Sequence, residues 1–273
     1  MQQQTFNFKE FRNAGQNIDL AFNFWKTHFK IFFKSSLRLC VPFIVIGTAI
    51  AGAGELLFPE NANAVSTISI FGNLIVIIGQ IYSMTLAFSL VKESMVNTNS
   101  LTVDTLIKGA KTNTLSFIVA YFLYLIILLL GLLFFIVPGI YISVTFALIF
   151  PIIAFEQKNI GDAISRCNLL IKDNWWSSFL FLIILSFITL FVTIFVLQFP
   201  SLLVGVFIGL NILQEGDAAI GTGLGNTITI LSMITSCFNP LVFAVYQYGM
   251  CALYFSLREK KEAISILDEI DSL

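Results

Sequence analysis

Few residues of this chain have the types and spacing that catalysis or metal binding requires. His28 is the only histidine, so a multi-histidine metal centre is excluded and a histidine-based catalytic pair would depend on this one residue. The four cysteines show no Cys-x-x-Cys spacing. An enzyme would have to use Glu156, Asp162 and Arg166, the remaining candidates. We therefore expect no enzyme, with no catalytic residue, metal ligand or cofactor.

The composition indicates the environment in which these few polar residues lie. Of the 273 residues, 57% are hydrophobic and 11% are charged, whereas soluble domains have roughly 25% charged residues. Runs of about 20 apolar residues can cross a bilayer as helices. Six runs approach or exceed this length, at positions 39–58, 68–91, 114–137, 140–155, 177–199 and 228–257. The sequence predicts an all-α integral membrane protein with six transmembrane helices arranged as three hairpins.

The distribution of charge predicts the topology. Lysine and arginine collect in cytoplasmic loops of membrane proteins, and all 15 of them fall on one side if the N-terminus is cytoplasmic. The predicted outer loops hold Glu60, Glu215 and Asp217 and no cation. We expect a cytoplasmic N-terminal segment at 1–38, a six-helix membrane domain at 39–257 and a cytoplasmic amphipathic tail at 258–273. A short apolar segment at 200–213 suits a re-entrant or interfacial position.

Amphipathic stretches precede the first, third and fifth spans. In the first, apolar residues recur at steps of three and four from Ile18 to Phe33, and lysines line the opposite face. Such helices suit the headgroup region of an anionic leaflet. The later copies end at Asn113 and Asn174, which we expect to act as N-caps of the following spans. The predicted headgroup contacts are Trp25, Lys26, Lys30, Lys34, Lys108, Lys111, Lys172, Trp175 and Trp176.

Three prolines have different predicted roles. Pro138 and Gly139 suit a tight turn between spans three and four. Pro151 should bend the fourth span near its end, and Pro240 should leave a carbonyl unpaired within the sixth. Polar residues within spans more often join helices than form a site. A cavity near these prolines would be lined by Asn73, Gln80, Asn239 and Gln247.

The region from Phe135 to Phe179 resembles the signature of a broad group of bacterial six-span membrane proteins. The matching residues are Pro138-Gly139-Ile140-Tyr141, Pro151, Glu156, Gly161, Ala163, Arg166 and Asn174-Trp175-Trp176. The group includes the membrane domain attached to some glycerophosphodiester phosphodiesterases, and many members have no defined function. Cys167 and Asp173 depart from the pattern, which usually has serine and glycine there. The resemblance implies a bacterial cytoplasmic (inner) membrane protein, with any phosphodiesterase chemistry in a separate soluble domain.

Two functions are compatible with these patterns. The first is a non-enzymatic scaffold that interacts with anionic membrane lipids, or organises a membrane-protein partner, without binding nucleic acid. The alternative is a carrier for a lipid-like or amphiphilic molecule through a cleft near Pro151 and Pro240. A tightly filled bundle centre would favour the first function, and a polar cavity reaching the membrane midplane would favour the second.

Overall fold

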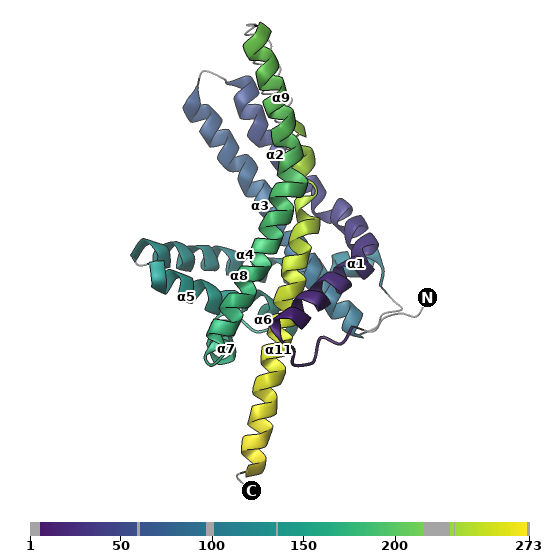
Figure 1. Cartoon of the computed structure of the whole chain (residues 1–273), viewed down its shortest axis with the longest axis vertical. Helices are drawn as coiled ribbons and strands as arrows, with labels where there is room; N and C mark the ends of the chain where they lie inside the picture. Colours follow the sequence, from purple (N-terminus) through teal and green to yellow (C-terminus); the bar gives the residue numbers. More distant parts are fainter. Residues whose placement is uncertain are drawn as a thin grey trace. The chain divides into compact units, whose positions relative to one another are not determined.

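The computed structural model describes residues 6–58, 61–96, 101–134, 136–215, 230–231 and 233–271. Every regular element within these ranges is helical, in agreement with the predicted all-α class (Figure 1). The elements are α1 (Ala14–Leu39), α2 (Val41–Leu57), α3 (Ala62–Val96), α4 (Val103–Phe134), α5 (Ile136–Phe146), α6 (Ile149–Glu156), α7 (Ile160–Ile171), α8 (Trp175–Val192), the π-helical η2 (Thr193–Gln198), α9 (Phe199–Glu215) and α11 (Asn239–Asp271).

Five helical segments are long and apolar enough to cross a membrane. They are Ala62–Val96, Val103–Gly131, Val137–Glu156, Trp175–Gln198 and Met233–Ala263. A sixth is obtained only if α1 and α2, which meet at an angle of 49°, are counted as one broken span. The described part of the chain is therefore all-helical and has several membrane-span-like helices.

The helices form two compact units. Unit 1 comprises Met1–Ser35, Ile81–Ser186 and Ala244–Leu273, and unit 2 comprises Ser36–Gln80 and Phe187–Phe243. Every lysine and arginine except Arg38 belongs to unit 1. The predicted boundary at 257–258 coincides with no break, because α11 continues through it to Asp271.

The α2–α3 hairpin of unit 2 is packed through small residues. A Cβ atom built on Gly72 would lie 2.5 Å from both the backbone nitrogen of Ala51 and the carbonyl oxygen of Gly47. Gly79 faces Ile44 and the carbonyl oxygen of Cys40 in the same way. Small residues allow the backbones of two membrane helices to approach closely, which replaces the hydrophobic driving force that lipid cannot supply.

The core of unit 1 is built around α11. Its residues from Ala244 to Leu257 are almost all buried, and Tyr248, Tyr254 and Phe255 are among the largest buried side chains. The N-terminal segment packs on this helix, since the Ser256 hydroxyl accepts from the Arg12 backbone N–H at 3.1 Å and donates to the Arg12 carbonyl at 3.0 Å. The first and last described parts of the chain therefore belong to one core.

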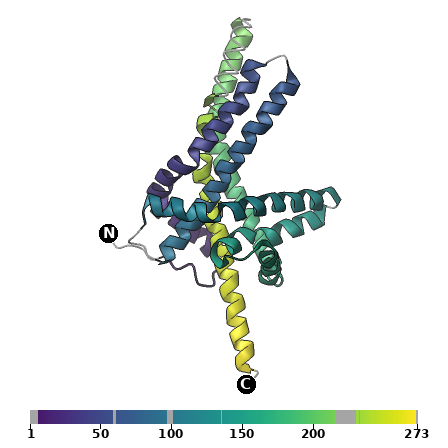
Figure 2. The same cartoon turned by 180° about the vertical axis from the view of Figure 1, so that it is seen from behind.

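The α4–α5 hairpin runs across α11 and across the part of α8 in the same unit, as both views show (Figures 1 and 2). One face of α4 is apolar and exposed, including Leu115, Val119, Phe122, Ile126, Leu129 and Leu133. The two helices of the hairpin are in close contact, because a Cβ on Gly131 of α4 would lie 2.8 Å from the Cα of Gly139 of α5.

Two predictions of local structure, an N-cap and a tight turn, are wrong. Asn113 is no N-cap, because α4 continues through it. Pro138 and Gly139 lie within the first turns of α5 rather than at the centre of a tight turn. Proline is tolerated there because the first N–H groups of a helix have no partner within it. Gly139 instead allows α4 and α5 to approach.

The other two prolines lie at helix breaks. Pro151 is the third residue of α6, and the interruption between α5 and α6 includes Ala147, whose carbonyl a continuous helix would pair with residue 151. The fourth span is therefore interrupted at the position predicted from Pro151. Pro240 is the second residue of α11 and follows a turn at Cys237 and Phe238 within the span-length segment Met233–Ala263, so this segment, too, is interrupted beside its proline.

Candidate functional site

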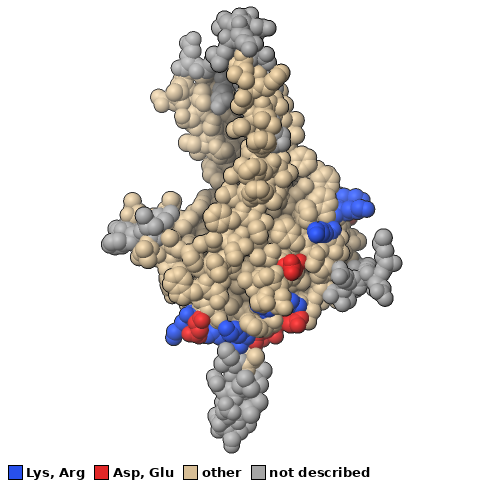
Figure 3. All heavy atoms as spheres, in the orientation of Figure 1, with Lys and Arg blue, Asp and Glu red and all other residues tan. Residues whose placement is uncertain are grey.

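Charged side chains gather along one margin of the face shown in Figure 3. The charged residues of α7, of the connection from α7 to α8, and of α11 between Arg258 and Glu262 all belong to unit 1. They form two neighbouring groups. One is a network around Glu156, and the other joins α11 to the start of α8.

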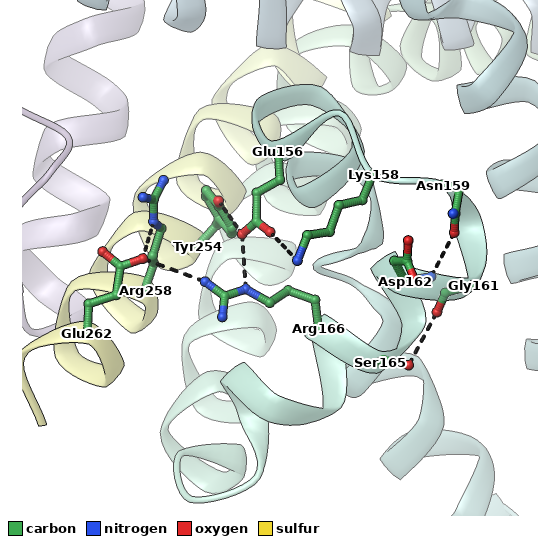
Figure 4. A network of polar contacts seen from close by, with 10 residues as sticks. All are labelled: Glu156, Lys158, Asn159, Gly161, Asp162, Ser165, Arg166, Tyr254, Arg258 and Glu262. Carbon is green, nitrogen blue, oxygen red and sulfur yellow. Dashed lines mark hydrogen bonds and ion pairs between the residues drawn. The ribbon is translucent and has the colours of Figure 1, made fainter. Parts of the chain in front are cut away.

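The Glu156 network is positioned by the sharp connection from α6 to α7. Gln157 has a left-handed backbone, with φ of 52°, and Asn159 caps α7 by accepting from the Asp162 backbone N–H at 2.9 Å. This reversal brings α7 back beside the end of α6 (Figure 4). As a result, Arg166 Nε donates to Glu156 Oε1 at 3.1 Å.

Three donors converge on the Glu156 carboxylate. Besides Arg166, the Tyr254 hydroxyl of α11 donates to Oε1 at 2.8 Å, and Lys158 Nζ lies 3.0 Å from Oε2. The Glu156 side chain is only 12% exposed. A carboxylate held by several charged or polar donors joins the elements that supply them, here α6, α7 and α11.

The network extends along α11. Arg166 also reaches Glu262 at 3.6 Å, and Arg258 Nε donates to the same Glu262 oxygen at 2.7 Å (Figure 4). Two of the three residues that the sequence left as candidates for catalysis, Glu156 and Arg166, are thus in contact. Asp162 lies in the first turn of α7, where a carboxylate is favoured by the helix dipole.

A second set of contacts fixes α11 to the connection between α7 and α8. Lys261 forms an ion pair with Asp173, and the hydrogen bond from Lys261 holds the pKa of Asp173 below its usual range. Lys260 Nζ donates to Asn174 Oδ1 at 2.6 Å. The side-chain oxygen that was expected to cap α8 therefore accepts from a lysine of α11.

An aromatic groove lies beside this connection. It has a volume of about 580 Å³ and is lined in part by Tyr141, Lys172, Trp175 and Trp176. The Trp175 ring stacks on Tyr141 at a centroid distance of 5.3 Å, and its Nε1 donates to the Tyr141 carbonyl at 3.3 Å. Trp176 is 75% exposed. Three of the predicted headgroup residues are thus brought into one groove.

The predicted headgroup residues of α1 form two adjacent rows. Lys26, Lys30 and Lys34 are exposed at intervals of one helical turn. Beside them run the half-buried rings of Trp25, Phe29 and Phe33, with Trp25–Phe29 and Phe29–Phe33 centroid distances of 5.1 Å and 6.0 Å.

A third face of α1 packs on protein. Phe24 and Phe32 are buried and contact Tyr248 of α11. The predicted apolar face is therefore divided, because Phe32 is covered by α11 whereas Trp25, Phe29 and Phe33 stay half-buried. On α4, Lys108 and Lys111 are both exposed.

The four predicted cavity residues are not brought together within one unit. Asn73 and Gln80 are exposed on α3, and with Asn239 they belong to unit 2, whereas Gln247 belongs to unit 1. Asn239 Oδ1 and Gln247 Oε1 are buried and have no hydrogen-bond partner among the described residues. A common cavity lined by the four residues stays a prediction.

Sequence reasoning missed Tyr254 and Glu262 as partners of the Glu156 network. Their spacing of two helical turns with Arg258 between them places all three on one face of α11, and this is the signal that could have identified them. Comparisons with known proteins add no further assignment: no family model, curated protein or solved structure matches the chain.

Proposed function

We propose that this chain is a non-enzymatic multi-pass protein of the bacterial cytoplasmic membrane, and that it serves as a lipid-interacting scaffold with both termini in the cytoplasm. The observation that carries the proposal is the pair of adjacent rows on α1. Exposed lysines at successive turns can contact anionic headgroups, while tryptophan and phenylalanine rings beside them lie at the boundary between headgroups and acyl chains.

The aromatic groove supports the same role at a second place. Trp175, Trp176 and Tyr141 supply amphipathic rings, and Lys172 supplies an exposed cation beside them. Juxtamembrane lysines contribute about 1 kcal/mol each to binding of an anionic surface. The α1 lysines and Lys172 together give the protein a multivalent preference for anionic lipid.

The test compares thermal stability in nanodiscs of purely zwitterionic lipid with stability in nanodiscs that contain phosphatidylglycerol. We expect the anionic lipid to raise the Tm of the natural chain by several degrees. In the triple variant Lys26→Gln, Lys30→Gln, Lys34→Gln, most of this increase should be lost.

The matched control keeps the charge at the same positions, as Lys26→Arg, Lys30→Arg, Lys34→Arg, and should retain the increase. An equal Tm of the natural chain in both kinds of nanodisc would contradict the proposal.

A further inference from the structure

A hollow that two lysines line in unit 1 lies between the end of α3, the beginning of α4 and the end of α6. Its volume is about 340 Å³, which is within the range of small-ligand sites. Lys92 of α3 and Lys108 of α4 both line it. Lys108 was expected to contact headgroups at the surface, whereas Lys92 was not singled out by the sequence.

The wall of the hollow supplies hydrogen-bond donors near the two lysines. Neither lysine has an ion-pair partner among the residues that the structure describes. Thr112 donates its hydroxyl proton to the Lys108 carbonyl at 3.0 Å, so it can only accept from a ligand. Ser89 and Asn113 also line the hollow and can donate to an oxygen anion.

Charge and shape define the ligand further. Glu93 is the acidic residue in the lining, so two lysines and one glutamate leave one positive charge, which matches a phosphodiester with its single negative charge. Phe88 and Phe117 also border the hollow, but both rings are buried, so they form its wall and offer no surface to a ligand. The apolar surface lies beside the hollow on α4, where exposed Leu115 and Val119 follow Lys108 by two and three helical turns on the same face. Both features together suit an amphiphile that carries a phosphate group.

We propose that this hollow binds the phosphodiester headgroup of one anionic phospholipid, with the phosphate between Lys92 and Lys108 and the acyl chains along the exposed apolar face of α4 that begins at Leu115. The inference rests on the proposed lipid-interacting function and gives it a discrete site. It differs from the α1 rows, which contact the leaflet at an open surface.

A single substitution can reduce the volume of the hollow without changing its charge. A Cβ atom built on Gly109 would lie 3.2 Å from the Ser89 hydroxyl oxygen, on the opposite wall. A leucine at this position would therefore occupy part of the hollow. Leucine is also a better helix former than glycine, so α4 should tolerate the substitution.

The experiment uses the full chain in detergent and native mass spectrometry to count bound phosphatidylglycerol as its concentration is raised. The double variant Lys92→Gln, Lys108→Gln should weaken the tightest binding event by an order of magnitude or more, since each lysine contributes about fivefold. Gly109→Leu should weaken it similarly. The matched control Lys9→Gln, Lys111→Gln removes the same charge from exposed positions outside the hollow and outside the α1 lysine row, and should leave this event unchanged.

The remaining outcomes separate this site from the broader function. Equal weakening in the control and in the Lys92/Lys108 variant would overturn the site, while nanodisc stabilisation by anionic lipid would still support the scaffold. If the natural chain bound sn-glycerol 3-phosphate or inorganic phosphate as tightly as the lipid, the lipid assignment would be overturned in favour of a soluble phosphate ligand. If neither soluble compound displaced the lipid, the proposal would be supported.

Discussion

At the scale of single residues, the segment from Tyr141 to Trp175 corresponds to a structural junction. Glu156 and Arg166 form an ion pair, Ala163 is buried in α7, and the Asn174 side chain accepts from α11. Trp175 fixes the start of α8 to the Tyr141 carbonyl of α5. Glu156, Arg166, Asn174 and Trp175 each join two elements, so these residues specify how the helices meet.

Removing the Glu156 carboxylate should destabilise this junction. In Glu156→Ala, the Tyr254 hydroxyl and Lys158 lose the acceptors that they contact at 2.8 Å and 3.0 Å. Arg166 retains only the longer contact to Glu262. Hydrogen bonds to charged groups contribute about 1.5–3 kcal/mol each when buried, and partial exposure reduces this, so we expect a loss of about 2 kcal/mol in the free energy of unfolding. Denaturation in detergent micelles measures this loss.

Asp162→Asn is the matched control for this change, because Asp162 is acidic and near in sequence but has no side-chain contact in the network drawn in Figure 4. It should lower the unfolding free energy by less than about 1 kcal/mol, because it loses only the interaction of a carboxylate with the helix dipole of α7. A similar loss in both variants would show that negative charge near α7, and not the contacts of Glu156, stabilises the junction.

At the scale of elements, α4 shows why a residue preference can mislead. Asparagine favours caps, yet Ala110, Thr114 and Phe117 are all buried and continue one stripe past Asn113. A helix break there would interrupt this packing and leave backbone groups unpaired. Continuous burial of the stripe outweighs the weak preference of asparagine for a helix end.

The α2–α3 hairpin depends on glycine at its contact surface. In Gly72→Val, the new side chain would meet the backbone of α2, because even a Cβ atom would lie 2.5 Å from the Gly47 carbonyl oxygen. Backbone cannot move aside as a flexible side chain can, and overpacking typically costs 1–3 kcal/mol, so we expect a loss of about 3 kcal/mol. Unfolding of the purified variant, followed by circular dichroism, measures this loss.

The control for the hairpin is Gly209→Ala in α9, which is also in unit 2. A Cβ on Gly209 has no neighbour within 4 Å. The substitution should be neutral or stabilise the helix by up to about 1 kcal/mol. Equal tolerance of both substitutions would contradict a close-packed α2–α3 contact.

At the scale of the whole molecule, the lysines and arginines are concentrated in one of the two units, whereas along the sequence some of them precede each of the three predicted hairpins. Unit 1 carries every lysine and arginine except Arg38 and contains both ends of the chain. Unit 2 consists mainly of apolar helices. This division is compatible with the proposed topology, in which cations stay on the cytoplasmic side because their translocation is disfavoured.

Single-cysteine labelling in intact cells tests this topology. The four native cysteines are first replaced, and a cysteine is then placed at Lys108, Lys172 or Asn63. Lys108 and Lys172 lie on the proposed cytoplasmic side and are exposed, so an impermeant thiol reagent should leave them unmodified until the cells are opened. Asn63, exposed near the start of α3 on the proposed outer side, should react at once. Labelling of position 108 or 172 from outside would overturn the topology.

The class of the protein and much of its local structure follow from the sequence alone. Apolar runs of membrane-spanning length identify most of the long helices, and periodicity identifies the amphipathic character of α1. Pro151 predicts the break between α5 and α6. These features depend on hydrophobicity and on backbone chemistry within a few residues, which is information that a single stretch of sequence contains.

Only the tertiary structure decides which distant groups meet. Tyr254 lies 98 residues from Glu156 and yet donates to it. Lys92 and Lys108 share a hollow, and the α4–α5 hairpin runs across α11. The physical reason is that periodicity specifies which face of a helix is buried but leaves its partner open. The partner is selected by how side chains from separate segments fill space and satisfy each other's polar groups.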